Sequence, residues 1–332
     1  MLVFFKRFKW RLSVLLRSSL GLLPSNVIIS HGDVDGIISA ALVRRYLGED
    51  AYIIFTSPRN LSDTLSLIKG RKFKLYLTDL ALNLAIAQSV ADQLRNLKDK
   101  GCMITWIDHH PWSAEALEAV KPYVDSLVIR EETSAAKLVM EALSLRDPFS
   151  TRLVEIANDA DTARYELRIS RMYRSASRST RLKRKIIDLL VEGELMSEEI
   201  EKNLERSANV DVKLDDLSYD VLSTVSGRKF AIFDFRSSPG PVSCIVRALC
   251  QKEDLDFVLV IFSLRKFSLY RCRQADDINL RKICESYGGG GHTFACGGVL
   301  EVPLKDRIIS IFRPNYRPKE LENLVKDLIE LL

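Results

Sequence analysis

The sequence predicts a two-domain α/β protein: a doubly wound, mainly parallel sheet followed by a smaller α/β domain, with an active-site cleft between them. The first observation is the length of 332 residues, which suffices for two domains of roughly 100 to 200 residues each. The second is that short apolar runs alternate with helical patterns over the first half, as in parallel βαβ units. The third is a change to longer strands from about Leu222.

The expected boundaries follow from these patterns. Residues 1–25 are expected to form an amphipathic helix, because apolar residues recur at helical spacing while Lys and Arg interrupt them too often for a signal peptide or a membrane span. We favour a helix packed on the first domain over one that docks on a membrane surface or a partner. Residues 26–167 form the first domain, 168–216 a basic helical connector and 217–332 the smaller domain.

The strands are expected at short runs rich in β-branched and aromatic residues. In the first domain these runs are Asn26 to Ser30, Tyr52 to Phe55, Lys74 to Leu77, Cys102 to Ile107 and Leu127 to Ile129. In the second they are Lys229 to Phe233, Asp256 to Phe262 and Phe267 to Arg273, and a helix from Pro318 to Leu332 closes the chain. Open parallel sheets bind ligands beyond the carboxyl ends of their strands, so residues directly after strands are the first candidates for a site.

The composition is that of a soluble globular protein. Hydrophobic residues make up 47% of the chain and charged residues 28%, which excludes a disordered or membrane-embedded class. The six cysteines include no CxxC pair, so a zinc site built on such pairs is not expected. We interpret the cysteines as reduced thiols and expect a cytoplasmic protein without membrane attachment.

Acids and histidines follow three of the expected strands. They are His31, Asp33, Asp35, Asp79, Asp108, His109 and His110. A loop-like stretch from Ala157 to Thr162 adds Asp159 and Asp161. One such Asp alone is more simply a helix N-cap. The set is harder to explain by packing, because all four histidines of the chain lie in these segments or beside a run of glycines.

Five carboxylates at one edge of a sheet require neutralisation. They would repel each other and raise each other's pKa values unless cations balanced their charge. Two divalent ions supply four positive charges. Oxygen-rich ligation with one or two imidazoles suits Mn²⁺, or Mg²⁺, better than Zn²⁺.

These motifs closely resemble those of the DHH phosphoesterase superfamily, in its RecJ-like and oligoribonuclease branch. His31 to Gly36 matches the first motif, Asp79 the second and Asp108-His109-His110 the third, and Asp161 to Tyr165 looks like the fourth. The resemblance implies a catalytic set of His110, Asp79 and Asp108, in which Asp79 bridges two metals and His110 faces the substrate phosphate. It implies these metal ligands: His31, Asp33, Asp35, Asp79, Asp108, His109 and Asp161. Asp159 is the alternative to Asp161.

The C-terminal half contains a second motif of the same superfamily. Gly288 to His292 resembles the GGGH signature of the DHH-associated domain, and consecutive glycines let backbone amides approach a phosphate. The resemblance implies substrate binding by Gly289, Gly290, Gly291, His292 and Arg271. Arg273, on the same strand face, is the alternative to Arg271.

The resemblance implies a manganese-dependent phosphodiesterase that cleaves single-stranded DNA or RNA, or short oligonucleotides. A phosphatase of a small nucleotide, such as a cyclic dinucleotide or a nucleoside 3′,5′-bisphosphate, is the first alternative. A non-catalytic replication scaffold is less favoured because no expected acid is missing. We further expect a replication or repair partner protein and a homodimer as candidate partners.

The expected connector is strongly basic. Arg164, Arg168, Arg171, Arg174, Arg178, Arg181 and Lys185 recur at steps of three or four residues. On one helix this spacing would place them along one side. We interpret the row as a track for a nucleic-acid backbone, with an ordinary solvated helix face as the alternative.

Overall fold

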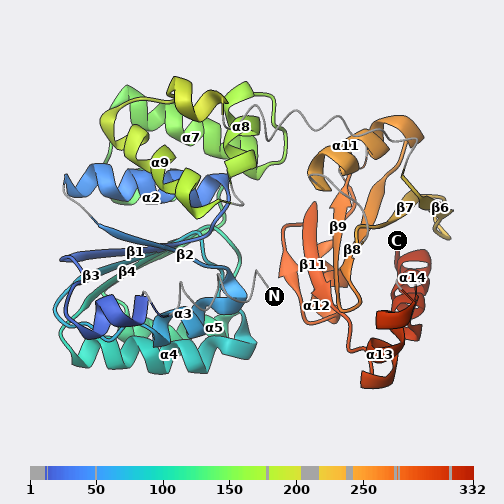
Figure 1. Cartoon of the computed structure of the whole chain (residues 1–332), viewed down its shortest axis with the longest axis horizontal. Helices are drawn as coiled ribbons and strands as arrows, with labels where there is room; N and C mark the ends of the chain where they lie inside the picture. The colour runs from blue at the N-terminus through green and yellow to red at the C-terminus, as the bar shows by residue number, and fades with distance from the viewer. Residues whose placement is uncertain are drawn as a thin grey trace. The chain divides into compact units, whose positions relative to one another are not determined.

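The computed structural model describes residues 12, 14–48, 51–176, 179–202, 217–236, 242–272, 275, 277–313 and 316–332. The chain divides into two compact units, Met1–Asn209 and Val210–Leu332, referred to below as unit 1 and unit 2. Figure 1 shows the elements of each. The expected helix at residues 1–25 is described only in part: Leu12 and Val14–Ser19 are helical.

Unit 1 is built on a five-stranded sheet in which every neighbouring pair is parallel, in the order β2-β1-β3-β4-β5. The strands are β1 (Asn26–Ser30), β2 (Tyr52–Phe55), β3 (Lys74–Thr78), β4 (Met103–Asp108) and β5 (Ser126–Ile129). All five expected strands are confirmed, with each end within one residue of the expected one. β1 is buried along its whole length, as expected of a central strand covered on both faces.

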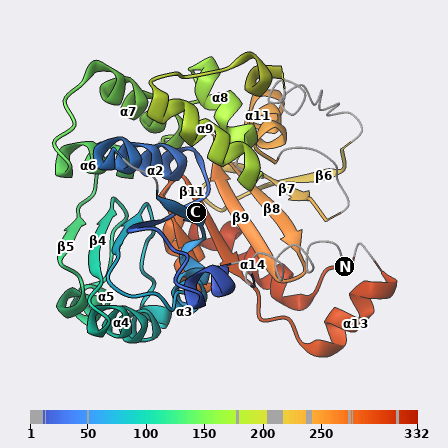
Figure 2. The ribbon, with the colours of Figure 1, turned by 60° about the vertical axis from the view of Figure 1, so that its left-hand side comes forward.

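Helices cover both faces of this sheet (Figures 1 and 2). One layer contains α2 (Val34–Leu47), α6 (Ala135–Ala142), α7 (Pro148–Asp161), α8 (Arg168–Ala176) and α9 (Thr180–Glu192). The other contains α3 (Leu61–Ser66), α4 (Leu84–Asp99) and α5 (Ala114–Val120). Each layer has its own apolar core, so the sheet is sealed on both sides and its strand ends remain the place for polar groups.

Two expectations about unit 1 need correction. The stretch from Ala157 to Thr162, expected to be loop-like, is helical up to Asp161 because Ala157 and Ala160 are buried in the core. The basic segment contributes α8 and α9 to the core of unit 1, through Tyr173, Ile187 and other buried residues. These helices therefore help to build the first unit.

Unit 2 contains a six-stranded mixed sheet in the order β10-β11-β9-β8-β7-β6. The strands are β6 (Tyr219–Ser223), β7 (Lys229–Asp234), β8 (Phe257–Ser263), β9 (Lys266–Arg271), β10 (Gly290–Gly291) and β11 (Ala295–Val299). Its helices are α11 (Val242–Glu253), α12 (Arg281–Ser286), α13 (Leu304–Phe312) and α14 (Lys319–Leu331). One core lies against α11 and the other against α12 and α14. The sequence predicted β7, β8, β9 and α14 and missed the other strands.

Among the cysteines whose side chains the structure describes, four are paired in unit 2. Cys250 is bonded to Cys272 and Cys284 to Cys296, while Cys102 is a buried free thiol. The expectation of reduced thiols is wrong for these four residues. Each pair joins a helix to a strand or its end, and sequence spacing cannot reveal such a contact. Among the described residues, every helix is too short or too polar to span a lipid bilayer.

Candidate metal site and phosphate-contact residues

The acids and histidines of unit 1 meet at the carboxyl ends of its parallel strands. His31 follows β1, Asp79 follows β3 and Asp108 ends β4. The register pairs Ser30 with Thr78 and Thr78 with Ile107. The three ends are therefore level, and their following residues share one edge of the sheet.

Three groups of these side chains place their potential ligand atoms within 4.8 Å of one another. The groups are His31, Asp33 and Asp79; Asp35, His109 and Asp161; and Asp79, Asp108 and His110. Asp79 belongs to two of the groups. All seven residues that the sequence proposed as ligands are brought together, and His110 lies with them.

His109 faces carboxylates with one ring nitrogen. Its Nε2 lies 3.7 Å from an oxygen of each of Asp35, Asp79 and Asp161. Its Nδ1 lies 3.0 Å from the backbone carbonyl of Glu132, which can only accept a hydrogen bond. A neutral His109 in that tautomer directs a lone pair at three carboxylates. The carboxylates and the imidazole lone pair repel one another, and a cation bound among them would replace this repulsion with attraction.

Asp79 combines backbone strain with burial. Its φ is +54°, in the left-handed region that non-glycine residues seldom adopt outside turns and functional sites. The residue is 1% exposed, and its Oδ2 accepts no hydrogen bond. Burial raises the pKa of this carboxyl well above its usual range, and the charges of Asp33 and Asp35 raise it further. A buried acceptor without a donor fits a metal ligand.

Asp35 is fixed by the start of α6. Its carboxylate accepts hydrogen bonds from the backbone amides of Ala135 and Ala136, at 2.7 and 2.9 Å. Gly36 stands beside it for a steric reason, because a Cβ at this position would lie 2.3 Å from the carbonyl oxygen of His31. The glycine lets α2 begin directly against the His31 backbone.

Asp159 and Asp161 are clearly distinguished. The Asp159 carboxylate accepts hydrogen bonds from the backbone amides of Glu166 and Leu167, at 2.9 and 3.0 Å, and from the hydroxyl of Ser170. Asp161 instead lies 3.7 Å from His109. Burial raises the pKa of Asp161 well above its usual range, and Asp35 raises it further. Asp161 therefore has the geometry of a ligand, and Asp159 fixes the chain that follows α7.

Two histidine–carboxylate contacts hold the remaining ligand candidates. His31 Nδ1 lies 2.7 Å from Asp33 Oδ2. Burial raises the pKa of Asp33, but the charge and hydrogen bond of His31 outweigh it and the pKa lies well below its usual range. His110 Nδ1 lies 2.8 Å from Asp108 Oδ1, and Trp112 donates a hydrogen bond to Asp108 Oδ2 at 2.8 Å. Trp112 and the Glu132 carbonyl are partners that sequence reasoning missed.

Lys183 is a further residue that the sequence did not single out. It is 6% exposed, and its Nζ lies 4.3 Å from the centre of the Phe55 ring and 3.4 Å from the carbonyl oxygen of Gly32. A Cβ at Gly32 would lie 2.7 Å from this Nζ. Burial lowers the pKa of Lys183 to about 8. The ammonium group thus supports the backbone between the ligand candidates His31 and Asp33.

The basic row does not form one stripe. α8 ends at Ala176 and α9 begins at Thr180, so the row is divided between two helices. Arg164 precedes α8, and Arg178 lies outside the described residues. Arg171 donates to the carbonyls of Tyr165 and Glu166. Arg174 lies over the Tyr165 ring at 4.3 Å. The prediction of a single helical row is wrong because the pattern of basic residues continues through a helix break.

In unit 2, the proposed phosphate-contact residues meet around Phe294. The His292 ring stacks on Phe294 with 5.0 Å between centroids and 5° between planes. The Arg271 guanidinium lies 5.9 Å from the same ring and donates to the Ile278 carbonyl at 3.2 Å. The structure therefore brings Arg271 and His292 together, and Phe294 is the residue that the sequence did not reveal. Arg273 lies outside the described residues.

Close packing explains two of the glycines. A Cβ at Gly289 would lie 1.8 Å from the Gly297 carbonyl oxygen. At Gly291, where φ is +132°, a Cβ would lie 2.7 Å from the Ala295 carbonyl oxygen. Gly290 has open space around it. The run thus packs tightly on β11 at Gly289 and Gly291. Gly288 also has open space but a φ of +62°, so Gly290 is the one glycine of the run with neither a close neighbour nor a positive φ.

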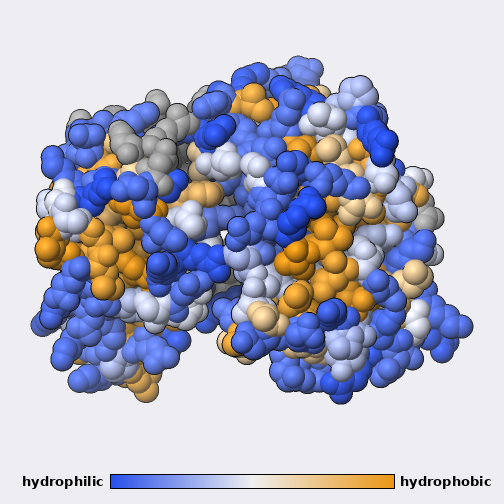
Figure 3. Space-filling view, turned by 180° about the vertical axis from the view of Figure 1, so that it is seen from behind, coloured by the Kyte–Doolittle hydropathy of each residue, from blue (hydrophilic) through white to orange (hydrophobic). Residues whose placement is uncertain are grey.

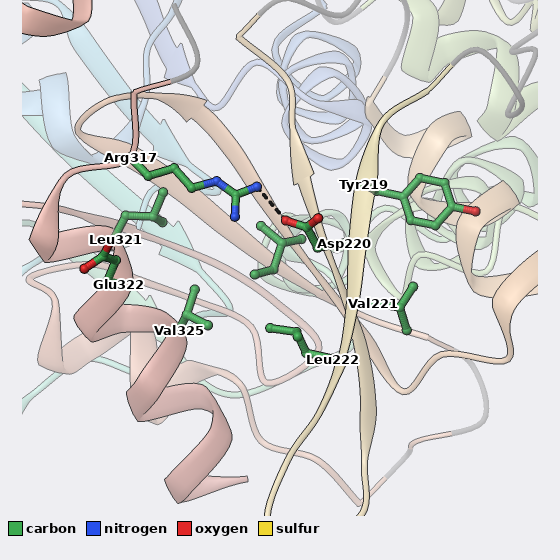
Figure 4. Close-up of a pocket in the computed structure, with 9 residues that line it drawn as sticks. Tyr219, Asp220, Val221, Leu222, Arg317, Leu321, Glu322 and Val325 are labelled. Atoms are coloured by element: carbon green, nitrogen blue, oxygen red, sulfur yellow. Dashed lines mark hydrogen bonds and ion pairs between the residues drawn. The ribbon is translucent and has the colours of Figure 1, made fainter. Parts of the chain in front are cut away.

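A separate hollow of about 600 Å³ lies between β6 and α14 of unit 2. Figure 4 shows Arg317 reaching Asp220 across it, with 2.5 Å between Nη2 and Oδ2. Leu222, Leu321 and other apolar residues line it. Figure 3 shows hydrophobic side chains at the surface of this part of unit 2. The lining contains none of the proposed phosphate-contact residues.

Comparison with known proteins shows the fold. No family model matches the sequence, and no curated protein matches it either. Among solved structures, a pGpG-specific phosphodiesterase from Vibrio cholerae is 13% identical with a TM-score of 0.52, over 91% of this chain and 99% of that one. The DHH domain of a member of a family of ribosomal proteins is 16% identical with a TM-score of 0.58, over 97% and 90%.

A third solved structure is RecJ from Thermus thermophilus in complex with Mn²⁺. It is 13% identical with a TM-score of 0.53, and the match covers 95% of this chain but 54% of that one. The chain therefore has the two-domain α/β fold of DHH-domain proteins.

Proposed function

We propose that this chain, with the fold of DHH-domain proteins, is a metal-dependent phosphodiesterase. The observation that carries the proposal is the convergence of seven acids and histidines on one sheet edge. At that edge, a buried Asp79 oxygen accepts no hydrogen bond. Such an arrangement is unfavourable without cations and suits a pair of divalent ions.

The proposed metal ligands are those that the sequence indicated. They are His31, Asp33, Asp35, Asp79, Asp108, His109 and Asp161. Asp79 is proposed to bridge, since it belongs to two of the three groups. When bound, two Mn²⁺ or Mg²⁺ ions would polarise the scissile phosphate and lower the pKa of a water molecule. Oxygen-rich ligation supports these ions over zinc.

The chain's own residues would orient the substrate and balance its charge. Asp108 holds the His110 ring through Nδ1, and we propose that His110 faces a phosphate oxygen. This contact keeps the ring in one orientation, which preorganises it to meet charge that develops on the phosphate. Arg271, His292 and the glycines Gly289, Gly290 and Gly291 are proposed as further phosphate contacts.

Single-stranded nucleic acid or short oligonucleotides are the proposed substrates. A small nucleotide is the alternative, because a pGpG-specific phosphodiesterase and RecJ exonucleases are both among the similar folds. A replication or repair partner protein, a homodimer and a cytoplasmic location remain predictions.

The decisive experiment is digestion of end-labelled DNA and RNA of two to about twenty nucleotides, with Mn²⁺, Mg²⁺ or a chelator. Faster cleavage of longer strands supports the nuclease, and faster cleavage of dinucleotides supports the alternative. Activity that persists in the chelated sample would contradict the metal-dependent mechanism.

A further inference from the structure

One disulfide encloses the glycine run. Cys284 in α12 is bonded to Cys296 in β11, with a sequence separation of 12 residues. The segment between them contains all of Gly288 to His292. The other disulfide, between Cys250 and Cys272, encloses no glycine.

Both ends of the Cys284–Cys296 bond touch the glycine segment directly. The amide of Gly289 donates to the carbonyl of Cys284 at 2.8 Å, and Gly291 pairs with Cys296 across the β10–β11 ladder. The amide of His292 donates to the Ala295 carbonyl at 2.9 Å. Fixing the two cysteines therefore fixes the backbone on both sides of the run.

Consecutive glycines need such a constraint. Glycine loses more conformational freedom on ordering than any other residue. If a loop becomes ordered only when it binds its ligand, the entropy lost on ordering weakens the affinity. A loop that is already ordered before binding does not have this cost. A covalent link across the run limits the conformations that the free chain can adopt.

We propose that the Cys284–Cys296 disulfide positions the glycine segment for phosphodiester binding. The inference rests on the function proposed above. The two cysteines would touch no substrate and would act through Gly289, Gly291 and His292. Loss of the bond should weaken substrate binding and leave the metal site in unit 1 intact.

The test compares two double variants, Cys284→Ser with Cys296→Ser and, as a matched control, Cys250→Ser with Cys272→Ser. Each lacks one disulfide of unit 2. Hydrogen exchange at the Gly289 and His292 amides should accelerate about tenfold in the first variant and stay unchanged in the control. The KM for Mn²⁺-supported oligonucleotide cleavage should rise about tenfold in the first variant, with kcat and bound metal nearly unchanged.

Chemical reduction supplies a test that does not depend on folding of the first variant. In the Cys250→Ser, Cys272→Ser background, a water-soluble phosphine cleaves the remaining bond. The phosphine gives up two electrons and takes oxygen from water to become its oxide, and the two sulfurs become thiols. Mass spectrometry after alkylation should show two additional thiols, and exchange at Gly289 and His292 should accelerate.

The outcomes separate the two proposals. Unchanged exchange after reduction, or no additional thiols on reduction, would overturn the positioning role of the disulfide. If exchange becomes faster but the protein cleaves no phosphodiester with any metal, the disulfide still positions the glycine segment and the proposed activity is contradicted.

Discussion

Nε2 of His109 lies 3.7 Å from Oδ1 of Asp79, although the two residues follow different strands of the sheet. The distance is too long for a hydrogen bond and suits two ligands of one ion. Asp79→Asn, which retains a residue that tolerates positive φ, and His109→Ala should each lower kcat by about 100-fold or more with loss of bound metal. Circular dichroism should show that both variants stay folded. Asp92→Asn, at an exposed carboxylate of α4, is the control and should retain full activity.

Asp159 and Asp161 should respond oppositely to the same change. Asp159→Asn weakens three hydrogen bonds and should cost about 1 to 3 kcal/mol of unfolding free energy in denaturant. Asp161→Asn should remove metal binding yet leave the chelated protein as stable or more so, because its ionised form is disfavoured by burial and by Asp35. If only the Asp159 variant lost metal, Asp159 and not Asp161 would be the metal ligand.

Metal affinity should increase with pH. The pKa values of Asp35, Asp79 and Asp161 are raised, by burial first, so metal must displace protons from these groups. A carboxyl whose pKa is higher in the folded than in the unfolded protein stabilises the metal-free fold at acid pH. This contribution is lost as the pH rises through the pKa of the folded state. Melting temperatures with chelator should therefore fall above about pH 4, whereas the stabilisation by Mn²⁺ should grow. An affinity independent of pH would contradict this view.

Lys183 should act on the metal site without contacting it. Lys183→Met keeps an unbranched side chain but removes the ammonium group that lies over the Phe55 ring and donates to Gly32. Metal affinity, measured by calorimetry, should fall roughly 10- to 100-fold as the backbone between His31 and Asp33 loosens. If the ammonium acted only through its positive charge, which repels a cation, its removal would strengthen metal binding instead. Lys185→Met, on the same helix but paired with Glu199, should have no effect.

His292→Ala and Arg271→Ala should weaken substrate binding and leave the metal in place. Both side chains contact the Phe294 ring, and each is proposed to donate to phosphate. KM should rise by about tenfold for each. Metal content, measured by mass spectrometry, should match the wild type, and a parallel loss of metal would contradict the proposed division of roles.

The strands and the convergence of the acids and histidines could be predicted because their signals are local. An apolar run of four to six residues followed by an acid or a histidine is visible in the sequence, and the ends of parallel strands meet by geometry. The choice between Asp159 and Asp161 could not be made, since only the fold shows which carboxylate meets backbone amides. Lys183 looked like one member of a charge run, and its burial depends on packing between α9 and Phe55.

Contacts between distant segments were also invisible. The disulfides join elements whose cysteines are 22 and 12 residues apart with no motif to pair them. Phe294 gave no signal because one aromatic residue directly before a strand matches no motif. The basic row misled us because spacing alone does not show where a helix ends.

The proposed ligands extend along the chain from His31 to Asp161 and converge only when β1, β3, β4 and α7 are all in place. An ion that binds them selects the fully folded unit and not a partly folded one. At a concentration 100 times its Kd, one such ion adds about 2.7 kcal/mol to the free energy of unfolding. Proteases that degrade transiently opened chains would meet correspondingly fewer of them. If the proposed metal site is correct, the lifetime of this protein in a cell would depend on the supply of its divalent metal, and starvation for that metal would lower its abundance as well as its activity.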